Sequence, residues 1–218
     1  MKIINKMWIT ESDYLHGIFG KSIESKKIAG FDLDHTIIKP IDNKTFSKND
    51  EDWEFFNNDV PKKLLKYHME GYKIVIYTNQ KGILKKNPCI DIWKSKIEKM
   101  ANILQIPFTI IASIMDDYTR KPRTFMFDKL IKYDKETSFY CGDAGGLKER
   151  TINGSIFKDF SDGDLKFAIN LGIKFIHRDE FIFQLQYKPS DYIVVNITKN
   201  IPTSIPIKFD SKKKEVIE

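Results

Sequence analysis

Short apolar runs alternate with amphipathic stretches along most of the chain. Apolar runs rich in β-branched and aromatic residues predict buried strands at 28–31, 73–77, 108–114, 137–141 and 173–176. Apolar residues at helical spacing predict helices at 60–70, 91–104, 124–133, 165–170 and 179–184. Strands and helices that alternate at this rhythm predict an α/β fold, with a Rossmann-like, mainly parallel sheet covered by helices on both faces.

Three segments of the chain differ in character. Residues 1–27 are expected to be an N-terminal lead that packs on the core, and residues 28–187 form the main domain. Residues 188–218 contain several prolines and end in a charged run, so they are predicted to be an irregular tail or linker. A long polar stretch with four aromatic residues, at about 39–59, predicts an ordered flap within the main domain.

Composition narrows the class of protein. The chain has 218 residues, of which 41% are hydrophobic, enough to bury a core. Its net charge of +6 favours a polyanionic partner, nucleic acid first, although solvated lysine faces explain the charge about as well. Two cysteines, an N-terminus interrupted by charge and no apolar stretch of ~20 residues indicate a soluble intracellular protein without disulfides. Nothing in the sequence indicates a membrane partner or oligomerisation.

Polar residues follow the predicted strands at the edge where parallel-sheet proteins bind ligands. Asp32 and Asp34 come after the first predicted strand, Thr78 after the second and Asp143 after the fourth. Asp32 could attack phosphorus as a nucleophile, and Asp34 could protonate the leaving oxygen and later deprotonate a water molecule. The alternative for this pair is an Asp-rich turn at a strand end, which is common.

The remaining polar residues supply the other needs of phosphate chemistry. Thr78 and the amides after it could bind a phosphoryl oxygen, and Lys121 could offset its charge. Mg²⁺ prefers one or two carboxylates with phosphate oxygens and waters, and Asp32 and Asp143 supply that number. A turn threonine and a solvated lysine are the alternatives for each residue alone. All four clusters together, in this order, indicate a Mg²⁺-dependent phosphomonoesterase.

The order DxDxT, Thr, Lys and GDxxG resembles that of the haloacid dehalogenase superfamily. More closely, residues 28–183 resemble the 3′-phosphatase domain of the polynucleotide kinase 3′-phosphatase family. The segments that carry this likeness include IAGFDLDHTII, GYKIVIYTNQKGI, RKPRTFMFD, CGDAGG, KDFSDGDLKFAINLGIKF and HRDEFIF. The resemblance implies a haloacid dehalogenase fold without a large cap domain. It also implies a hydrolase that removes 3′-terminal phosphate from nucleic-acid ends, DNA first, in DNA repair.

Roles follow from this resemblance for residues at matching positions. Asp32 matches the nucleophile that forms an aspartyl-phosphate and also binds Mg²⁺. Asp34 matches the residue that acts as acid and base, and its backbone carbonyl matches a metal ligand. Thr78 matches the residue whose hydroxyl binds phosphate. Lys121 matches the lysine of the family motif, and Asp143 matches a further metal ligand.

Substrate contacts are also implied by the resemblance. Phe46, Lys85, Arg120 and Phe160 fall where the family is expected to grip a single-stranded end. Stacking on aromatic rings and a basic surface would hold a strand without reading its sequence. The alternatives are a place in the core for Phe160 and a structural role in the loop for Phe46.

The chain departs from the family pattern at three positions. His35 stands where a glycine is usual, and we expect a side chain there only if the backbone angles are ordinary. Leu147 replaces a common arginine and Phe125 a common glycine. These changes leave every catalytic group present, but they could alter the grip on substrate.

Two other functions remain open from the sequence. A small-molecule phosphatase of the same superfamily would commonly carry a Cys/His zinc loop between Thr78 and Lys121, where only Cys89 lies. A non-catalytic nucleic-acid-binding module would be expected to lack a catalytic carboxylate. The chain contains no GxxxxGK[ST] motif, and the resemblance leaves open whether a kinase domain follows in the full-length protein.

Overall fold

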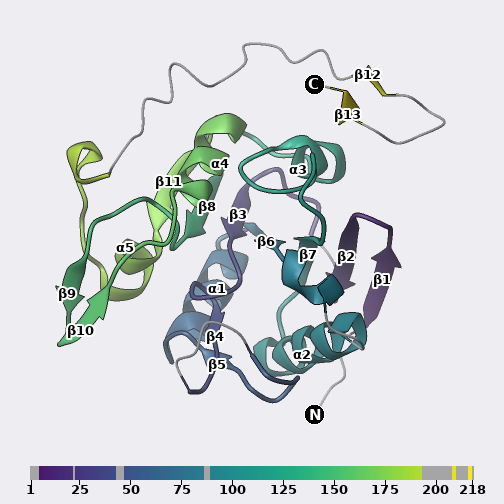
Figure 1. Ribbon diagram of the computed structural model, residues 1–218, viewed down its shortest axis with the longest axis horizontal. Coiled ribbons are helices and arrows are strands. Elements are labelled where there is room, and N and C mark those ends of the chain that lie inside the picture. Colours follow the sequence, from purple (N-terminus) through teal and green to yellow (C-terminus); the bar gives the residue numbers. More distant parts are fainter. Residues whose placement is uncertain are drawn as a thin grey trace.

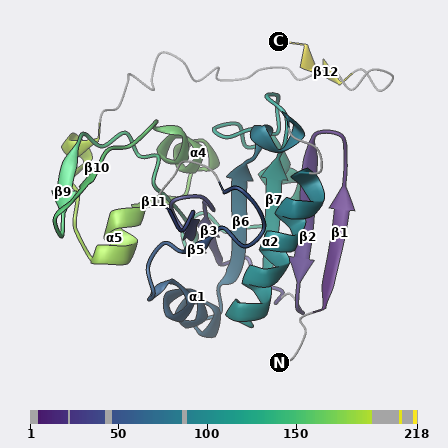
Figure 2. The ribbon, with the colours of Figure 1, turned by 60° about the horizontal axis from the view of Figure 1, so that its bottom comes forward.

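A central sheet organises the computed structural model of the protein, which describes residues 5–21, 23–42, 47–85, 89–192, 208–209 and 216–217. Within these residues the sheet has seven strands in the order β1-β2-β7-β6-β3-β8-β11 (Figures 1 and 2). Five of them are mutually parallel: β3 (Ile28–Phe31), β6 (Lys73–Asn79), β7 (Phe108–Ser113), β8 (Phe139–Gly142) and β11 (Lys174–His177). The predicted α/β fold with a mainly parallel sheet is confirmed.

Helices cover both faces of the sheet, α1 and α2 on one side and α3 and α4 on the other (Figure 1). Their bounds are α1 (Val60–Met69), α2 (Cys89–Leu104), α3 (Phe125–Leu130), α4 (Gly163–Leu171) and α5 (Arg178–Phe183). A proline in the first turn starts α1, and Gly172, with φ of +69°, ends α4 in the left-handed conformation that glycine adopts freely. The third helix is shorter than predicted because Ile131 is already extended.

The N-terminal segment extends the sheet by two strands. Strands β1 (Lys6–Thr10) and β2 (Tyr14–Phe19) form an antiparallel hairpin, and β2 pairs with β7 along six residues on each strand. The indole of Trp8 lies over Gly17, where a Cβ atom would come within 2.6 Å of the ring. Its Nε1 donates to Glu98 on α2 at 3.0 Å. The hairpin is therefore joined to the core by backbone pairing and by a side chain.

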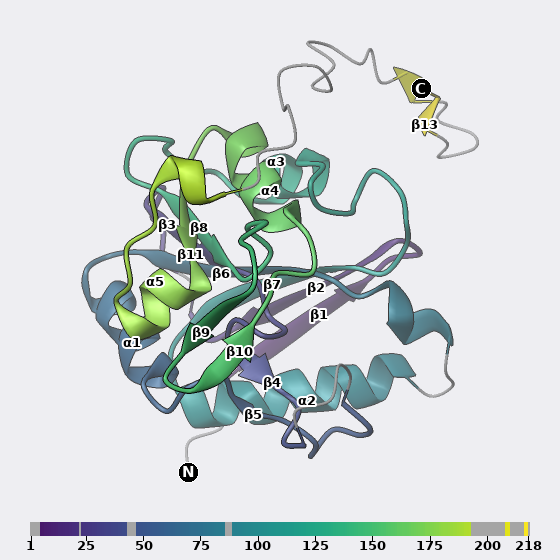
Figure 3. The same ribbon diagram turned by 60° about the vertical axis from the view of Figure 1, so that its left-hand side comes forward.

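Smaller elements lie at the carboxyl edge of the sheet and at its β11 end. The flap begins with β4 (Ile38–Lys39), which pairs with β5 (Glu54–Phe55). A hairpin of β9 (Arg150–Ile152) and β10 (Ser155–Phe157) lies next to α5 (Figure 3). Two 3₁₀ turns and a short strand pair complete the described elements: η1 (Lys81–Lys85), η2 (Pro189–Asp191), β12 (Lys208–Phe209) and β13 (Val216–Ile217). No helix in the described parts of the chain is long and apolar enough to cross a bilayer.

The direction of winding reverses at β3. Helices α1 and α2 lead outward from β3 to β6 and β7 on one face, whereas α3 and α4 accompany β8 and β11 on the other. In open α/β sheets, ligands bind beyond the carboxyl ends of the strands at such a reversal. Asp32, which directly follows β3, occupies this position.

If the N-terminal hairpin is part of the core, Leu15→Ala in β2 should lower the free energy of unfolding by about 2–5 kcal/mol, because Leu15 is fully buried. Met7→Ala in β1 is the control, since Met7 is 51% exposed, and it should change stability by less than about 0.5 kcal/mol. Urea unfolding followed by circular dichroism measures both. Equal, small effects of the two substitutions would contradict this account.

Candidate active site

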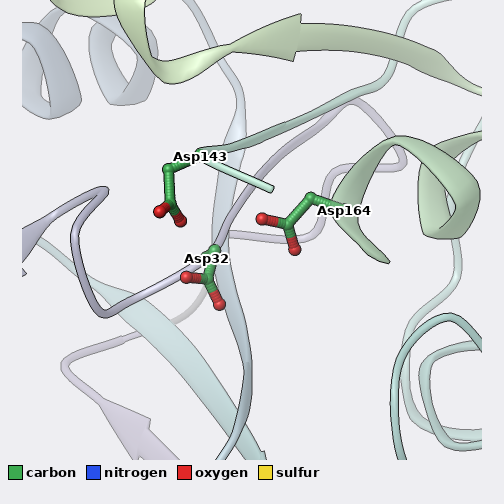
Figure 4. A group of neighbouring side chains, drawn as sticks. All are labelled: Asp32, Asp143 and Asp164. Carbon is green, nitrogen blue, oxygen red and sulfur yellow. The ribbon is translucent and has the colours of Figure 1, made fainter. Parts of the chain in front are cut away.

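Three carboxylates converge at the carboxyl edge of the sheet. Asp32 follows β3, Asp143 follows β8, and Asp164 comes from the first turn of α4. One oxygen from each lies within 4.8 Å of the others, and the three side chains lie close together (Figure 4). Asp32 and Asp164 are buried, and Asp143 is partly buried. Such a group of oxygen ligands suits a hard divalent cation.

Glycine at position 142 is what allows Asp164 to join the group. A Cβ atom there would lie 2.2 Å from Oδ2 of Asp164, closer than any side chain permits. The same Oδ2 accepts the backbone N–H of Ala144 at 3.0 Å. The sequence alone does not single out Asp164, because an aspartate at a helix start is usually explained as a capping residue. The one signal that could have found it is its place in the segment KDFSDGD, which resembles the family.

Lys121 holds two of the carboxylates together. Its Nζ donates to Asp32 Oδ1 at 2.6 Å, to Asp164 Oδ1 at 2.7 Å and to the hydroxyl of Tyr140 at 2.8 Å. The side chain is almost completely buried. Its backbone N–H donates to Asn79 Oδ1 at 2.9 Å, so the end of β6 fixes where the lysine enters the site. All three donor positions of the ammonium group are used.

Negative charge exceeds positive charge in this cluster. Burial raises the pKa of Asp32 well above its ordinary value, and the neighbouring Asp164 and Asp143 add to this against the opposing effect of Lys121. Burial and Asp164 also raise the pKa of Asp143 to about 6. Burial alone would lower the pKa of Lys121, but Asp164 and Asp32 raise it, so the lysine stays charged. A bound cation would relieve the repulsion among the carboxylates, and the residues present therefore fit a divalent metal.

The loop that carries Asp143 is held from behind by a buried charged network. Asp159 Oδ2 accepts the backbone N–H groups of Gly145 and Leu147, each at 2.9 Å. His177 accepts a backbone N–H at Nδ1, so its proton lies on Nε2, which is 3.1 Å from Asp159 Oδ2 and 3.2 Å from the carbonyl of Asp143. Arg150 pairs with Asp159 at 2.8 Å. This network fixes the backbone on both sides of Asp143.

The side chain of Gln80 joins Asp34 to Thr78. The amide of Gln80 donates to the carboxylate of Asp34 and, at 3.0 Å, to Oγ1 of Thr78. Thr78 is buried, whereas Asp34 is partly exposed. Gln80 was not among the predicted site residues, although it belongs to the TNQ segment. Its amide group therefore fixes the carboxylate of Asp34 relative to the hydroxyl of Thr78.

The predicted substrate contacts are described only in part. Phe46 lies outside the described residues, and Lys85 is described only as the last backbone position of η1. Arg120 is partly exposed, with its Nε 3.7 Å from Asp116 Oδ1. Phe160 is 100% exposed, which excludes the alternative of a place in the core.

The two sequence neighbours of Phe160, Asp159 and Ser161, line a hollow of about 450 Å³. Charged residues of both signs form part of its wall: Lys148, Lys158, Glu149 and Asp162. The GDAGG loop forms another part of this wall through Gly146. An exposed aromatic ring and two lysines therefore lie beside the loop that carries Asp143.

His35 departs from the expectation of ordinary backbone angles. Its φ of +58° lies in the left-handed region, which costs an ordinary L-residue about 1–2 kcal/mol, although histidine is found there more often than most. Leu147 is buried, and Phe125 packs edge-on against Tyr118 at 5.1 Å between ring centroids. These two replacements have structural contacts, whereas His35 keeps the strained turn that a glycine would form freely.

The fold is similar to that of solved phosphatase structures. The structure of a D,D-heptose 1.7-bisphosphate phosphatase from B. bronchiseptica, complexed with magnesium and phosphate, matches with a TM-score of 0.52 and 15% identity. The match covers 76% of this chain and 90% of that one. At this identity the likeness establishes the haloacid dehalogenase-like fold alone.

Two sequence relatives are more similar. The bifunctional polynucleotide phosphatase/kinase of Schizosaccharomyces pombe is 33% identical over 189 residues, which cover 84% of this chain and 44% of the relative. The chain thus spans less than half of that relative's length. The polynucleotide 3′-phosphatase of Saccharomyces cerevisiae is 30% identical, over 70% of this chain and 86% of the relative. The model of the family described as polynucleotide kinase 3 phosphatase matches residues 27–182. The chain therefore belongs to the polynucleotide kinase 3 phosphatase family.

Proposed function

We propose that this chain is a Mg²⁺-dependent polynucleotide 3′-phosphatase, which removes 3′-terminal phosphate from nucleic-acid ends, DNA first, as in DNA repair. The observation that carries the proposal is the buried lysine–carboxylate cluster at the winding reversal of the sheet, in a chain of this family. The cluster offers a nucleophile, a cation and a metal site within one small space.

The metal site of this proposal uses the converging carboxylates. Asp32 and Asp143 would hold Mg²⁺, with the carbonyl of Asp34 as a further ligand and Asp164 close behind. The bound ion would supply positive charge to the phosphoryl oxygens and fix their orientation. The structurally similar phosphatase from B. bronchiseptica was solved in complex with magnesium and phosphate, and the proposal assigns the same ion to this site.

The chemistry follows from how the two carboxylates of the DLD segment are held. One oxygen of Asp32 is bonded to Lys121, and its other oxygen is left to attack phosphorus. The P–O bond to the 3′ oxygen breaks as Asp34 gives that oxygen a proton, and Asp32 becomes an aspartyl-phosphate. Asp34 then takes a proton from water, which attacks the same phosphorus and releases inorganic phosphate and free Asp32. Thr78 binds a phosphoryl oxygen, and Gln80 keeps Asp34 facing the site.

The substrate proposal depends on access and on the exposed residues. The connection between β6 and β7 consists of η1 and α2, and α2 packs on the sheet, so the described residues include no large cap over the strand ends. Phe160 is free to stack on a base, with Lys148 and Lys158 nearby for phosphates. Arg120, Phe46 and Lys85 would complete the grip. A small-molecule phosphatase would not need this exposed ring.

Wild type should release phosphate from a 3′-phosphorylated oligonucleotide in the presence of Mg²⁺, and a chelator should stop the reaction. Asp32→Asn should lower turnover by at least about 10³-fold, because the amide cannot attack phosphorus. Asp91→Asn, an exposed aspartate on α2, is the matched control and should retain wild-type turnover. The rate of phosphate release is measured for wild type, Asp32→Asn and Asp91→Asn. A 5′-phosphorylated oligonucleotide cleaved equally fast would contradict the 3′ specificity, and turnover by Asp32→Asn would contradict its role.

Mg²⁺ should raise the melting temperature, because a ligand that binds only the folded state stabilises it. Asp164→Asn should reduce that rise, and Asp162→Asn, which removes a partly exposed carboxylate two residues away, should not. The rise should also shrink as the pH falls below about 6, since the pKa of Asp143 is raised to about 6 and protons then compete with the metal. Differential scanning fluorimetry measures these shifts. An equal response of the two variants would remove Asp164 from the metal site.

Phe160→Ala should raise KM for a 3′-phosphorylated oligonucleotide by about 5- to 150-fold, because losing one stacked base costs ~1–3 kcal/mol. It should leave the hydrolysis of p-nitrophenyl phosphate unchanged, since that ester is too small to reach the ring. Ile156→Ala on β10 removes another exposed apolar side chain and serves as the control. Steady-state kinetics with both substrates test this. If wild type hydrolysed a 3′-mononucleotide as efficiently as the oligomer at low salt, the small-molecule interpretation would replace ours.

A further inference from the structure

Arg178 is a buried arginine that joins three parts of the fold near the site. It is the first residue of α5 and is 5% exposed. Its Nε and Nη2 donate to Oδ1 of Asp179 at 2.9 and 2.8 Å. Its Nη1 donates instead to the backbone carbonyl of His35 at 2.9 Å. The fork geometry of a guanidinium allows these bonds to be made at once.

Two aromatic rings hold the guanidinium in this position. Its central carbon lies 4.5 Å from the ring centroid of Phe56, at the end of the flap, and 5.1 Å from that of Phe157 in β10. Cations over aromatic faces are attracted by the ring quadrupole, most strongly where water is excluded. Arg178 is therefore fixed by Asp179 on one edge and by two rings, and it has little freedom to leave His35.

The contact with His35 is made where the backbone is strained. His35 has the left-handed φ of +58°, and its N–H donates to the carbonyl of Ile38 at 2.7 Å. Its carbonyl is the acceptor for Arg178. Both backbone polar groups of this residue are thus held, which is what a strained non-glycine conformation requires in order to persist.

This turn determines where the catalytic carboxylates lie. His35 follows Asp34 and precedes Thr36, whose hydroxyl donates to Oδ1 of Asp143 at 3.4 Å. Nη1 of Arg178 also lies 3.8 Å from Oδ2 of Asp143. Arg178 therefore faces both the loop after β3 and the loop after β8. A shift of the turn would move Asp34 relative to Asp32 and Asp143.

We propose that Arg178 is a positioning residue for the phosphatase reaction: it holds the turn at His35 in its left-handed form and thereby sets the place of Asp34 beside the Asp32–Asp143 pair. The proposal rests on the phosphatase activity proposed above. It predicts that the need for Arg178 depends on which residue occupies position 35. Glycine reaches the left-handed region without a penalty, so a glycine turn needs less support.

The test is a double-mutant cycle of wild type, Arg178→Met, His35→Gly and the double variant, assayed with p-nitrophenyl phosphate at saturating Mg²⁺. Met fills much of the space of the arginine stem but lacks the fork. Arg178→Met should lower kcat about 10- to 100-fold with a change in KM of less than about 3-fold. In the His35→Gly background the same substitution should cost at least about 5-fold less, because glycine removes the backbone penalty.

Arg150→Met is the matched control. Arg150 also pairs with Asp179, through Nε at 2.6 Å, but the described contacts give it no bond to His35. Its substitution should cost the same in both backgrounds. Two results would overturn the proposal and leave Arg178 with only a structural role. One is a wild-type kcat in Arg178→Met. The other is a change in kcat loss between the histidine and glycine backgrounds that is no larger for Arg178→Met than for Arg150→Met. The proposal also falls if Arg178→Met lowers kcat by the same factor with histidine and with glycine at position 35.

Two further measurements keep the test decisive. If Arg178→Met does not give a cooperative melt, Arg178→Lys replaces it. Lysine keeps the positive charge but lacks the guanidinium donors. We expect a smaller loss of kcat in Arg178→Lys, and we expect His35→Gly to reduce that loss as well. The Mg²⁺-induced rise in melting temperature reports on the turn without turnover, and it should fall in Arg178→Met and recover in the double variant. A wild type inactive on every phosphate ester would overturn the proposed function, whereas an active wild type without coupling would overturn only the role of Arg178.

Discussion

The buried contact of Lys121 with Asp32 and Asp164 is the interaction on which the site depends. Removing charges from water is costly, and it is tolerated only where partners and hydrogen bonds are nearly ideal. Here the ammonium group reaches two carboxylates and one hydroxyl within 2.8 Å. The contact draws together the end of β3, the start of α4 and the loop after β7, which are far apart in sequence. Removing one of these partners from the folded protein would leave the others as buried charges without full pairing.

Rigidity around the cluster comes from a second group of buried charges. Asp159, His177 and Arg150 fix the loop around Asp143, while Arg178 and Asp179 support the turn at His35. Both groups use residues from the far end of the sheet, between β9 and α5. The hairpin β9–β10 and helix α5 therefore serve the site although they carry none of its reacting atoms.

Much of this arrangement could be predicted from the sequence. The parts that could not be predicted have one physical reason in common. The parallel strands and most helices have strong apolar patterns, and polar residues at the carboxyl ends of three strands mark the site, although Thr78 lies within β6 and not after it. Strand β1 lacks such a pattern because it is an edge strand with most of its side chains exposed. Asp164 and Arg178 become informative only through partners distant in sequence, which no local spacing encodes. The exposure of Phe160 likewise depends on how its loop lies on the surface.

The charges of the site bear on how metal and substrate come together. Three carboxylates face one ammonium group, with Arg178 3.8 Å from Asp143, so the cluster without metal is negative. A phosphate monoester carries the same sign, so this cluster would repel it in the absence of a cation. Mg²⁺ held by one or two carboxylates completes its ligand set with phosphate oxygens and waters. Burial, with the neighbouring carboxylates adding to it, raises the pKa of Asp32 and Asp143. A bound divalent cation would favour the charged forms of these carboxylates and would offset their repulsion of a phosphate. Lys121 cannot replace that cation, because its three protons are already donated within the protein.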